Sequence, residues 1–130
     1  MKVYGSYHHV HLVSRDPEVA AAWYEKALGA EITGRGQGKG SAMVRIELGE
    51  AKVSIRGLRE GEVAPDVDTP PLIGLNHIGL MVDDIEWATR SVADNGGKII
   101  EAPHVGTSGN IVAHVECPEG VLIEFLQPKS

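Results

Sequence analysis

The sequence predicts an α+β fold of two βαβββ modules, which form an open, cupped mixed β-sheet with the helices on its outer face. The first observation behind this prediction is an internal repeat. A segment starting at His77 resembles one starting at His9, and the same offset, 68 positions from residue 9 to residue 77, aligns Leu12 with Leu80, Asp16 with Asp84, Ala20 with Ala88, Gly29 with Gly97 and Ile32 with Ile100. The second observation is that each copy contains one helical pattern among four short segments of strand character.

The first module is expected to span about residues 5–57 and to begin with a strand and a helix. Residues 7–14 alternate in polarity, which predicts a strand. Asp16 is a suitable N-cap and Pro17 a favoured first helical residue. We therefore expect a helix to start there and to end at Gly29.

Three more strands complete this module. Residues 30–34 are expected to form a short strand, followed by a flexible loop over the glycine-rich run 35–41, which is expected to be the end of a hairpin. Residues 43–48 and 51–56 alternate on either side of a tight turn at Gly49, so their apolar side chains share one face. The opposite face then carries Met43, Arg45, Glu47, Ser54 and Arg56.

A linker and a second module complete the single domain expected over residues 1–130. Residues 58–73, approximately, are rich in glycine, proline and acidic residues and carry no periodicity, which is typical of a linker. The second module, about residues 74–128, repeats the order of the first. Its expected elements are a strand at 75–82, a helix at 85–95, a strand at 98–102, a loop at 103–109, and strands at 110–116 and 121–127.

Alternation in the last strand places a carboxylate inside the cup. In residues 121–127 the bulky apolar residues at odd positions belong against the helix, which leaves Glu124 between leucines on the other face. A carboxylate in such surroundings is costly to bury unless it meets a cation. The same parity places His9, His11 and His77 in the cup. Two repeat-equivalent histidines, His9 and His77, and Glu124 are a ligand set for Zn, Ni, Co, Mn or Fe(II) that leaves coordination positions open.

Composition and charge exclude several classes of function. The chain carries a net charge of -6 and no basic cluster, which argues against nucleic acid or an anionic membrane as a partner. No apolar run approaches the roughly 18 residues that a membrane span needs, and the first residues show no signal-peptide pattern. A soluble cytoplasmic protein with a small-molecule substrate is therefore expected. Cys117 is the single cysteine, which excludes an internal disulfide.

Four motifs of this chain resemble the vicinal oxygen chelate superfamily. They are His9-x-x-Leu12 with Asp16, Trp23-Tyr24-x-x-x-Leu28-Gly29, Leu75-Asn76-His77-Ile78-Gly79-Leu80, and Cys117-Pro118-Glu119-Gly120-Val121-Leu122-Ile123-Glu124. This family includes glyoxalase I, methylmalonyl-CoA epimerase, extradiol dioxygenases, fosfomycin-resistance enzymes and metal-free bleomycin-resistance proteins. The resemblance covers nearly the whole chain and implies paired βαβββ modules. It also implies a homodimer, which is common among small members.

In the metal-dependent members of that family the ligands come from the first, fourth, fifth and eighth strands. The resemblance therefore implies His9, His77 and Glu124 as metal ligands. The fourth-strand position, counted from the turn glycine, is Ser54, which is a poor ligand. Glu47, or Glu124 after it leaves the metal ion, is the candidate catalytic base.

The resulting hypothesis is a divalent-metal-dependent lyase or isomerase of the glyoxalase I or methylmalonyl-CoA epimerase type. It would act on a small carbonyl-containing substrate through a metal-stabilised enolate. The alternatives are an Fe(II)-dependent ring-cleaving dioxygenase-like enzyme and a metal-free protein that binds a drug or a metabolite. Arg45 and Arg56 suit a carboxylate or phosphate of the substrate. They are equally well explained as ordinary strand residues whose side chains are solvated. The expected substrate contacts are His11, Arg45, Ser54, Arg56 and His114.

Overall fold

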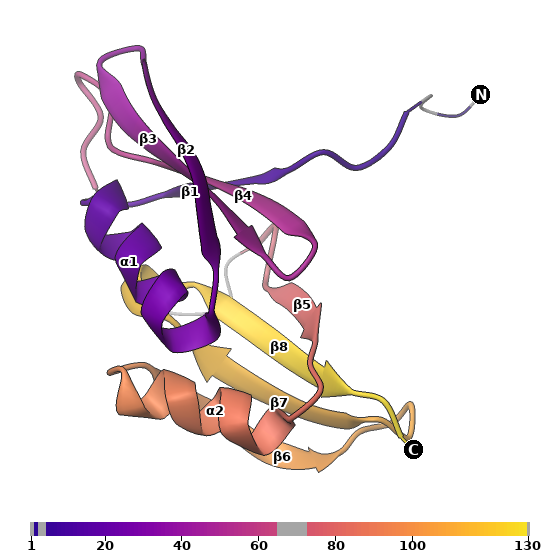
Figure 1. Ribbon diagram of the computed structural model, residues 1–130. Coiled ribbons are helices and arrows are strands. Elements are labelled where there is room, and N and C mark those ends of the chain that lie inside the picture. The colour runs from indigo at the N-terminus through magenta and orange to yellow at the C-terminus, as the bar shows by residue number, and fades with distance from the viewer. Residues whose placement is uncertain (1, 3–4, 65–72, 130) are drawn as a thin grey trace. The chain divides into compact units, whose positions relative to one another are not determined.

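The computed structural model describes residues 2, 5–64 and 73–129. The chain divides into two compact units: unit 1 comprises Met1–Glu25 and Gly29–Ala64, and unit 2 comprises Lys26–Leu28 and Pro65–Ser130. A strand, a helix and three more strands follow one another twice along the chain (Figure 1). The predicted α+β class with two βαβββ modules is therefore confirmed. The predicted linker falls in part on residues 65–72, which lie outside the described residues.

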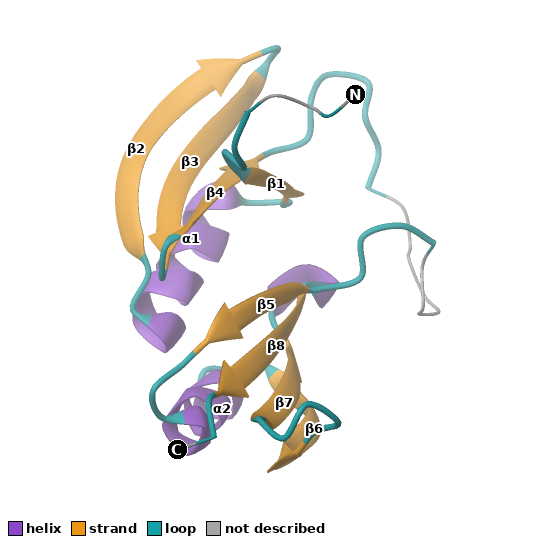
Figure 2. Cartoon of the chain, turned by 90° about the vertical axis from the view of Figure 1, so that its right-hand side faces the viewer, coloured by secondary structure: helices purple, strands orange, loops and turns teal. Residues whose placement is uncertain are grey.

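The first βαβββ segment forms a four-stranded mixed sheet with one helix. Its strand order is β1-β4-β3-β2, in which β1 runs parallel to β4 and the other neighbours are antiparallel (Figure 2). β1 is shorter than the strand predicted at 7–14, because only Val10–Val13 of that segment pair with β4. The elements are β1 (Val10–Val13), α1 (Pro17–Leu28), β2 (Glu31–Gly38), β3 (Ser41–Leu48) and β4 (Ala51–Arg56).

Helix α1 has the predicted bounds, because both ends are capped as the sequence indicates. The Asp16 carboxylate accepts a hydrogen bond from the Val19 N–H at 3.2 Å, and Gly29 ends the helix with a φ of 68°. Nε of Arg35 on β2 donates to Oε1 of Glu18 at 2.6 Å, so α1 lies on the sheet face that carries Arg35. The same face carries the buried apolar residues Val44, Ile46, Leu48, Val53 and Ile55.

The glycine-rich run after Ile32 does not form the predicted loop. The prediction of a loop over residues 35–41 is wrong, because β2 continues to Gly38 and pairs with β3 along this run, after a bulge near its start. The turn consists of Lys39 and Gly40, with φ of 52° and 78°. Such positive values suit a two-residue hairpin turn between antiparallel strands.

Unit 2 contains a second four-stranded mixed sheet with the equivalent strand order, β5-β8-β7-β6. β5 runs parallel to β8, and the remaining neighbours are antiparallel. Helix α2 starts after Asp84, whose Oδ1 accepts a hydrogen bond from the Trp87 N–H at 3.0 Å. The elements are β5 (Ile78–Met81), α2 (Ile85–Asp94), β6 (Lys98–Val105), β7 (Ile111–Glu116), the 3-10 turn η1 (Pro118–Gly120) and β8 (Leu122–Gln127).

The two faces of β8 differ as the alternation predicts. Ile123 and Phe125 are buried in the core of unit 2. The residues between and beside them, Leu122, Glu124 and Leu126, are only partly buried on the other face. Among the described residues, no helix is long and apolar enough to cross a membrane.

Strand β6 corrects a second prediction. It runs to Val105, so the expected loop over residues 103–109 is too long, and His104 lies in a strand rather than in a loop. Two register shifts against β7 accommodate Pro103, which an edge strand tolerates. Just before β6, the backbone of Gly97 approaches its neighbours closely, because a Cβ there would lie 2.8 Å from the carbonyl oxygen of Glu116.

Candidate metal centre

A row of register partners crosses the sheet of unit 2. Gly79 of β5 pairs with Glu124 of β8, Glu124 with His114 of β7, and His114 with Glu101 of β6. Register partners on neighbouring strands project from the same face. The imidazole and the two carboxylates therefore share the face opposite the buried core, and Gly79 contributes no side chain beside Glu124.

We call His77, His114 and Glu124 the donor cluster. One candidate ligand atom from each of them lies within 4.8 Å of the other two. Nε2 of His114 lies 2.9 Å from Oε2 of Glu124, and the rings of His77 and His114 meet edge to face with centroids 5.6 Å apart. The side chains of His114 and Glu124 are 29% and 24% exposed. A ligand can therefore reach the cluster from solvent.

Polar side chains lie beside both imidazoles. Nδ1 of His77 lies 2.8 Å from Oδ1 of Asn76. Because an amide oxygen only accepts hydrogen bonds, Nδ1 donates this bond, and in a neutral ring the lone pair is then on Nε2. Nδ1 of His114 lies 3.3 Å from Oε2 of Glu101, and Nε2 of His104 lies 3.7 Å from the same oxygen. A carboxylate thus stands behind His114 on the side away from the cluster.

The donor cluster has the chemistry of a divalent metal site. Imidazole nitrogens and carboxylate oxygens bind Zn, and two imidazoles with one carboxylate also suit Fe(II) in a site with open positions. Three such donors from one sheet face leave coordination positions for oxygen atoms of a ligand. The residues present therefore fit a bound divalent ion.

The first sheet carries an equivalent row with different side chains. His11 of β1 pairs with Ser54 of β4, Ser54 with Arg45 of β3, and Arg45 with Gly34 of β2. Because the strand orders are equivalent, Ser54 occupies the place that Glu124 has in unit 2. This row contains no carboxylate, and Ser54 is buried.

His9, a predicted metal ligand, lies beside this first row. Its ring meets the ring of His11 edge to face with centroids 5.3 Å apart, and its Nδ1 lies 2.7 Å from Nδ1 of His8. Burial lowers the pKa of His11, and electrostatic repulsion by His9, Arg56 and Arg59 lowers it further. The neutral form of His11 is therefore favoured.

The two predicted substrate-binding arginines differ in their partners. Nη1 and Nη2 of Arg56 donate to the two carboxylate oxygens of Glu62 at 2.6 and 3.2 Å, and this pairing lowers the pKa of Glu62 to about 2. The guanidinium of Arg45 lies against Gly34 and Gly36, where an added Cβ would be 3.4 and 3.7 Å from its nearest nitrogens. Within the described part of the chain, the Arg45 guanidinium has no hydrogen-bond or ion-pair partner.

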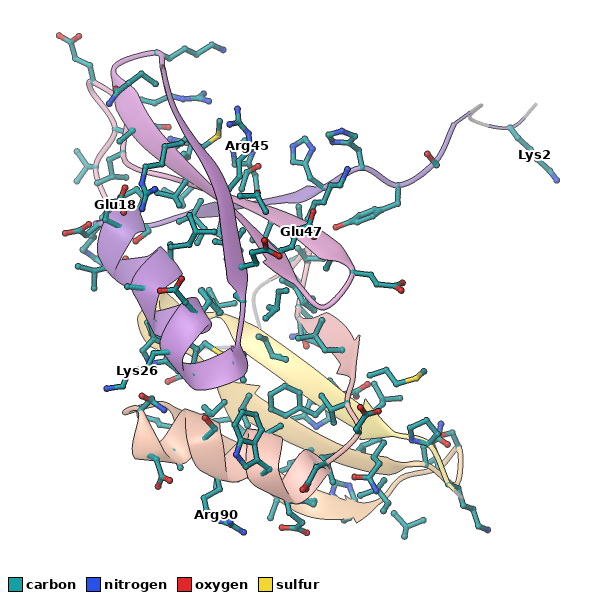
Figure 3. All side chains as sticks on the ribbon, viewed as in Figure 1. Lys2, Glu18, Lys26, Arg45, Glu47 and Arg90 are labelled. Atoms are coloured by element: carbon teal, nitrogen blue, oxygen red, sulfur yellow. The ribbon has the colours of Figure 1, made fainter. Side chains whose placement is uncertain are left out.

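Glu47, the predicted base, lies on the same strand as Arg45. Both side chains project from the side of β3 that faces away from Glu18 on α1 (Figure 3). Glu47 is partly buried and is the register partner of Lys52 on β4. This face of the first sheet therefore presents a cationic group and a carboxylate on one strand.

The structure brings three predicted site residues together and adds two that the sequence analysis did not identify. His77, Glu124 and His114 form the donor cluster, while the remaining predicted residues lie in unit 1, and their roles stay predictions. The added residues are Asn76 and Glu101. Asn76 had a sequence signal, which is its position next to His77. Glu101 had none, because the register shifts in β6 mean that alternation along the sequence does not tell which sheet face its side chain is on.

Comparison with known proteins gives one family. The model of the Glyoxalase/Bleomycin resistance protein/Dioxygenase superfamily matches residues 6–125. The ethylmalonyl-CoA/methylmalonyl-CoA epimerase of Cereibacter sphaeroides is 31% identical over 95% of this chain and 98% of its own length. The lactoylglutathione lyase of Haemophilus influenzae is 32% identical over 57% of this chain and 62% of its own length.

A solved structure shows the same fold. The glyoxylase/bleomycin resistance protein/dioxygenase domain from Frankia sp. EAN1pec superposes with a TM-score of 0.79. The superposition covers 97% of this chain and 93% of that chain at 18% identity. At this level of identity the similarity concerns the fold alone.

Proposed function

This chain belongs to the Glyoxalase/Bleomycin resistance protein/Dioxygenase superfamily, and from that premise we propose that it is a divalent-metal-dependent isomerase or lyase acting on a small carbonyl-containing substrate. The observation that carries the proposal is the donor cluster, in which His77 and Glu124 lie near each other. Similarity to an epimerase over nearly its whole length supports isomerase chemistry in particular.

We assign the metal ion to His77 and Glu124, with His9 as the further ligand that the sequence predicts. A bound divalent ion supplies a Lewis acid that stabilises negative charge on the substrate oxygens. Asn76 holds His77 in the tautomer whose Nε2 is free to bind. Glu124 contributes a negative charge, which favours a cation in this position.

Glu47 is the proposed base that removes the proton from the carbon next to the carbonyl group. Its partial burial and its place on a strand hold the carboxylate in a defined position. Glu124, after it leaves the metal ion, is the alternative base.

Arg45 is the proposed contact for an anionic group of the substrate. A guanidinium matches a carboxylate or phosphate with two parallel hydrogen bonds, and that of Arg45 is not engaged by an acidic side chain of the described residues. Arg56 is the weaker candidate, because Glu62 already occupies its terminal nitrogens. His11, Ser54 and His114 remain proposed substrate contacts.

Exchange of a substrate proton with solvent tests the proposed reaction. The metal-loaded protein is incubated in deuterium oxide with methylmalonyl-CoA or with lactoylglutathione, and deuterium on the carbon next to the thioester carbonyl is followed by NMR. We expect exchange with at least one compound, a loss of about 10²–10⁴-fold in Glu47→Gln, and little change in the control Glu50→Gln in the adjacent turn. Absence of exchange with both compounds, in protein that carries one metal ion per chain, would contradict the proposal.

Two other results would favour the alternatives. Oxygen uptake by the Fe(II)-loaded protein with an aromatic diol would indicate a ring-cleaving dioxygenase-like enzyme. Failure to bind Zn, Ni, Co, Mn or Fe(II) would indicate a metal-free protein that binds a drug or a metabolite. The homodimer and the cytoplasmic location are also proposals, and sedimentation velocity measures the first of them.

A further inference from the structure

We propose that His114 is itself a metal ligand, so that unit 2 alone supplies three donors: His77, His114 and Glu124. This inference rests on the proposed function, because it concerns the same metal ion. It assigns His114 a role other than the substrate contact that the sequence predicts. It also accounts for a site without a suitable fourth-strand ligand, where Ser54 stands.

The position of His114 carries the first step. It is the direct register partner of Glu124, and its Nε2 lies 2.9 Å from Oε2 of that residue. Divalent ions bind nitrogen and oxygen donors at about 2.0–2.2 Å, so donors that share an ion are roughly 3–4 Å apart. The donor atoms of the cluster lie within 4.8 Å of one another. Small rotations of side chains therefore suffice to place all three around one ion.

Hydrogen-bond matching carries the second step. Both ring nitrogens of His114 face carboxylate oxygens, Nε2 that of Glu124 and Nδ1 that of Glu101. Carboxylates only accept hydrogen bonds, and an imidazole that binds a metal ion through Nε2 has its single N–H at Nδ1. A metal ion at Nε2 fits this arrangement, because it would bind the nitrogen lone pair and the Glu124 carboxylate together. The single hydrogen then belongs on Nδ1, facing Glu101.

Glu101 provides the third step. Histidines that bind metal ions usually donate their other N–H to a carboxylate, a carbonyl or water, which fixes the tautomer and the ring orientation. Nδ1 of His114 is buried and has no aligned hydrogen-bond partner among the described residues, although Oε2 of Glu101 lies 3.3 Å away. A rotation of the exposed Glu101 side chain would align this contact. The His77–Asn76 pair provides the same support for the second imidazole.

The test compares Zn binding by the parent and by variants of the full chain. Metal-free protein is titrated with Zn in the presence of a competing chelator, and circular dichroism reports the fold of each variant. His114→Gln is the decisive substitution, because glutamine can still donate a hydrogen bond to Glu124 but is a poor ligand. His104→Ala is the matched control, since His104 also lies near Glu101 but outside the donor cluster.

We expect His114→Gln to weaken Zn binding by more than about 100-fold, beyond the roughly 10–100-fold that loss of a partner of a ligand causes. Glu101→Gln should show that smaller loss, and His104→Ala should bind Zn within about threefold of the parent. If His114→Gln does not fold, Glu101→Gln serves as the test instead. An unchanged Zn affinity in Glu101→Gln would overturn the proposal that Glu101 supports His114 as a ligand.

A count of bound imidazoles provides a readout that a merely structural role would not change. Pulsed EPR of the Cu(II)-loaded protein should detect one imidazole fewer in His114→Gln than in the parent. The same number in both proteins would overturn the inference.

The outcomes separate the inference from the proposed function. If the parent binds Zn and His77→Ala loses it while His114→Gln does not, the inference fails and the proposed function stands. If the parent binds none of the five metal ions, the proposed function fails, and the inference falls with it.

Discussion

Replacing Gly97 by alanine tests how closely this residue, just before β6, packs against α2 and β7. The added Cβ would lie 2.8 Å from the carbonyl oxygen of Glu116 and 3.1 Å from that of Val92, and it would overlap Cγ1 of Val92. Both oxygens belong to the backbone, and the Val92 side chain is fully buried. The overlap is therefore relieved only if the backbone of Gly97 moves away from α2, which contains Val92, and from β7, which contains Glu116.

The size of the effect follows from overpacking. Extra carbon atoms in a packed interior cost about 1–3 kcal/mol. The Gly97 N–H also donates to the Val92 carbonyl oxygen at 2.9 Å, and separation of helix and strand would weaken this bond. We therefore expect about 2–3 kcal/mol. At roughly 3–5 °C per kcal/mol for a chain of this size, Tm should fall by about 6–15 °C.

Thermal and urea unfolding followed by far-UV circular dichroism measure this loss. Gly38→Ala is the matched control, because Gly38 has no positive φ and no described heavy atom within 4 Å of the position of its Cβ. The control should be neutral, or more stable by up to about 1 kcal/mol. An unchanged Tm in Gly97→Ala would refute the close approach of Gly97 to α2 and β7.

Three further predictions concern single residues. Burial, aided by a neighbouring acidic residue, raises the pKa of the Cys117 thiol to about 12, so a thiol reagent at pH 8 should label the urea-unfolded chain rapidly and the native chain slowly; equal rates would contradict this. The Arg56 pair lowers the pKa of Glu62 from 4.5 to about 2, so its stabilisation is present above pH 4.5 and is lost as the pH falls toward 2. Glu62→Gln should therefore lower the urea midpoint at pH 7, and its midpoint should fall less than that of the parent between pH 4.5 and 2. An equal fall of the midpoint in both proteins would argue against the Arg56–Glu62 pair. Asp84→Ala removes the α2 cap to Trp87 and should cost about 0.5–2 kcal/mol in urea unfolding, whereas Asp84→Asn should cost less.

The parts of the fold predicted correctly are those in which local chemistry and periodicity agree. Asp16 and Gly29 cap α1 as the sequence predicts. Because of the repeat, the same reasoning predicts the start of α2 at Asp84. The errors lie at the glycine-rich end of β2 and around Pro103 in β6. In both places local loop signals lose to pairing with a neighbouring strand, which is a non-local effect.

The candidate site shows the same limit. Alternation alone predicts that Glu124 lies opposite the core, because β8 is regular. It could not predict that Glu101 lies behind His114, since two register shifts in β6 separate sequence parity from facing direction. The difference between Arg45 and Arg56 also depends on Glu62, which lies outside every strand.

The two equivalent rows carry permanent charges of opposite sign. The row centred on Ser54 has Arg45 as its permanent charge, whereas the row centred on Glu124 also contains Glu101 and carries two negative charges. Identical strand order thus supports one row that suits an anion and another that suits a cation.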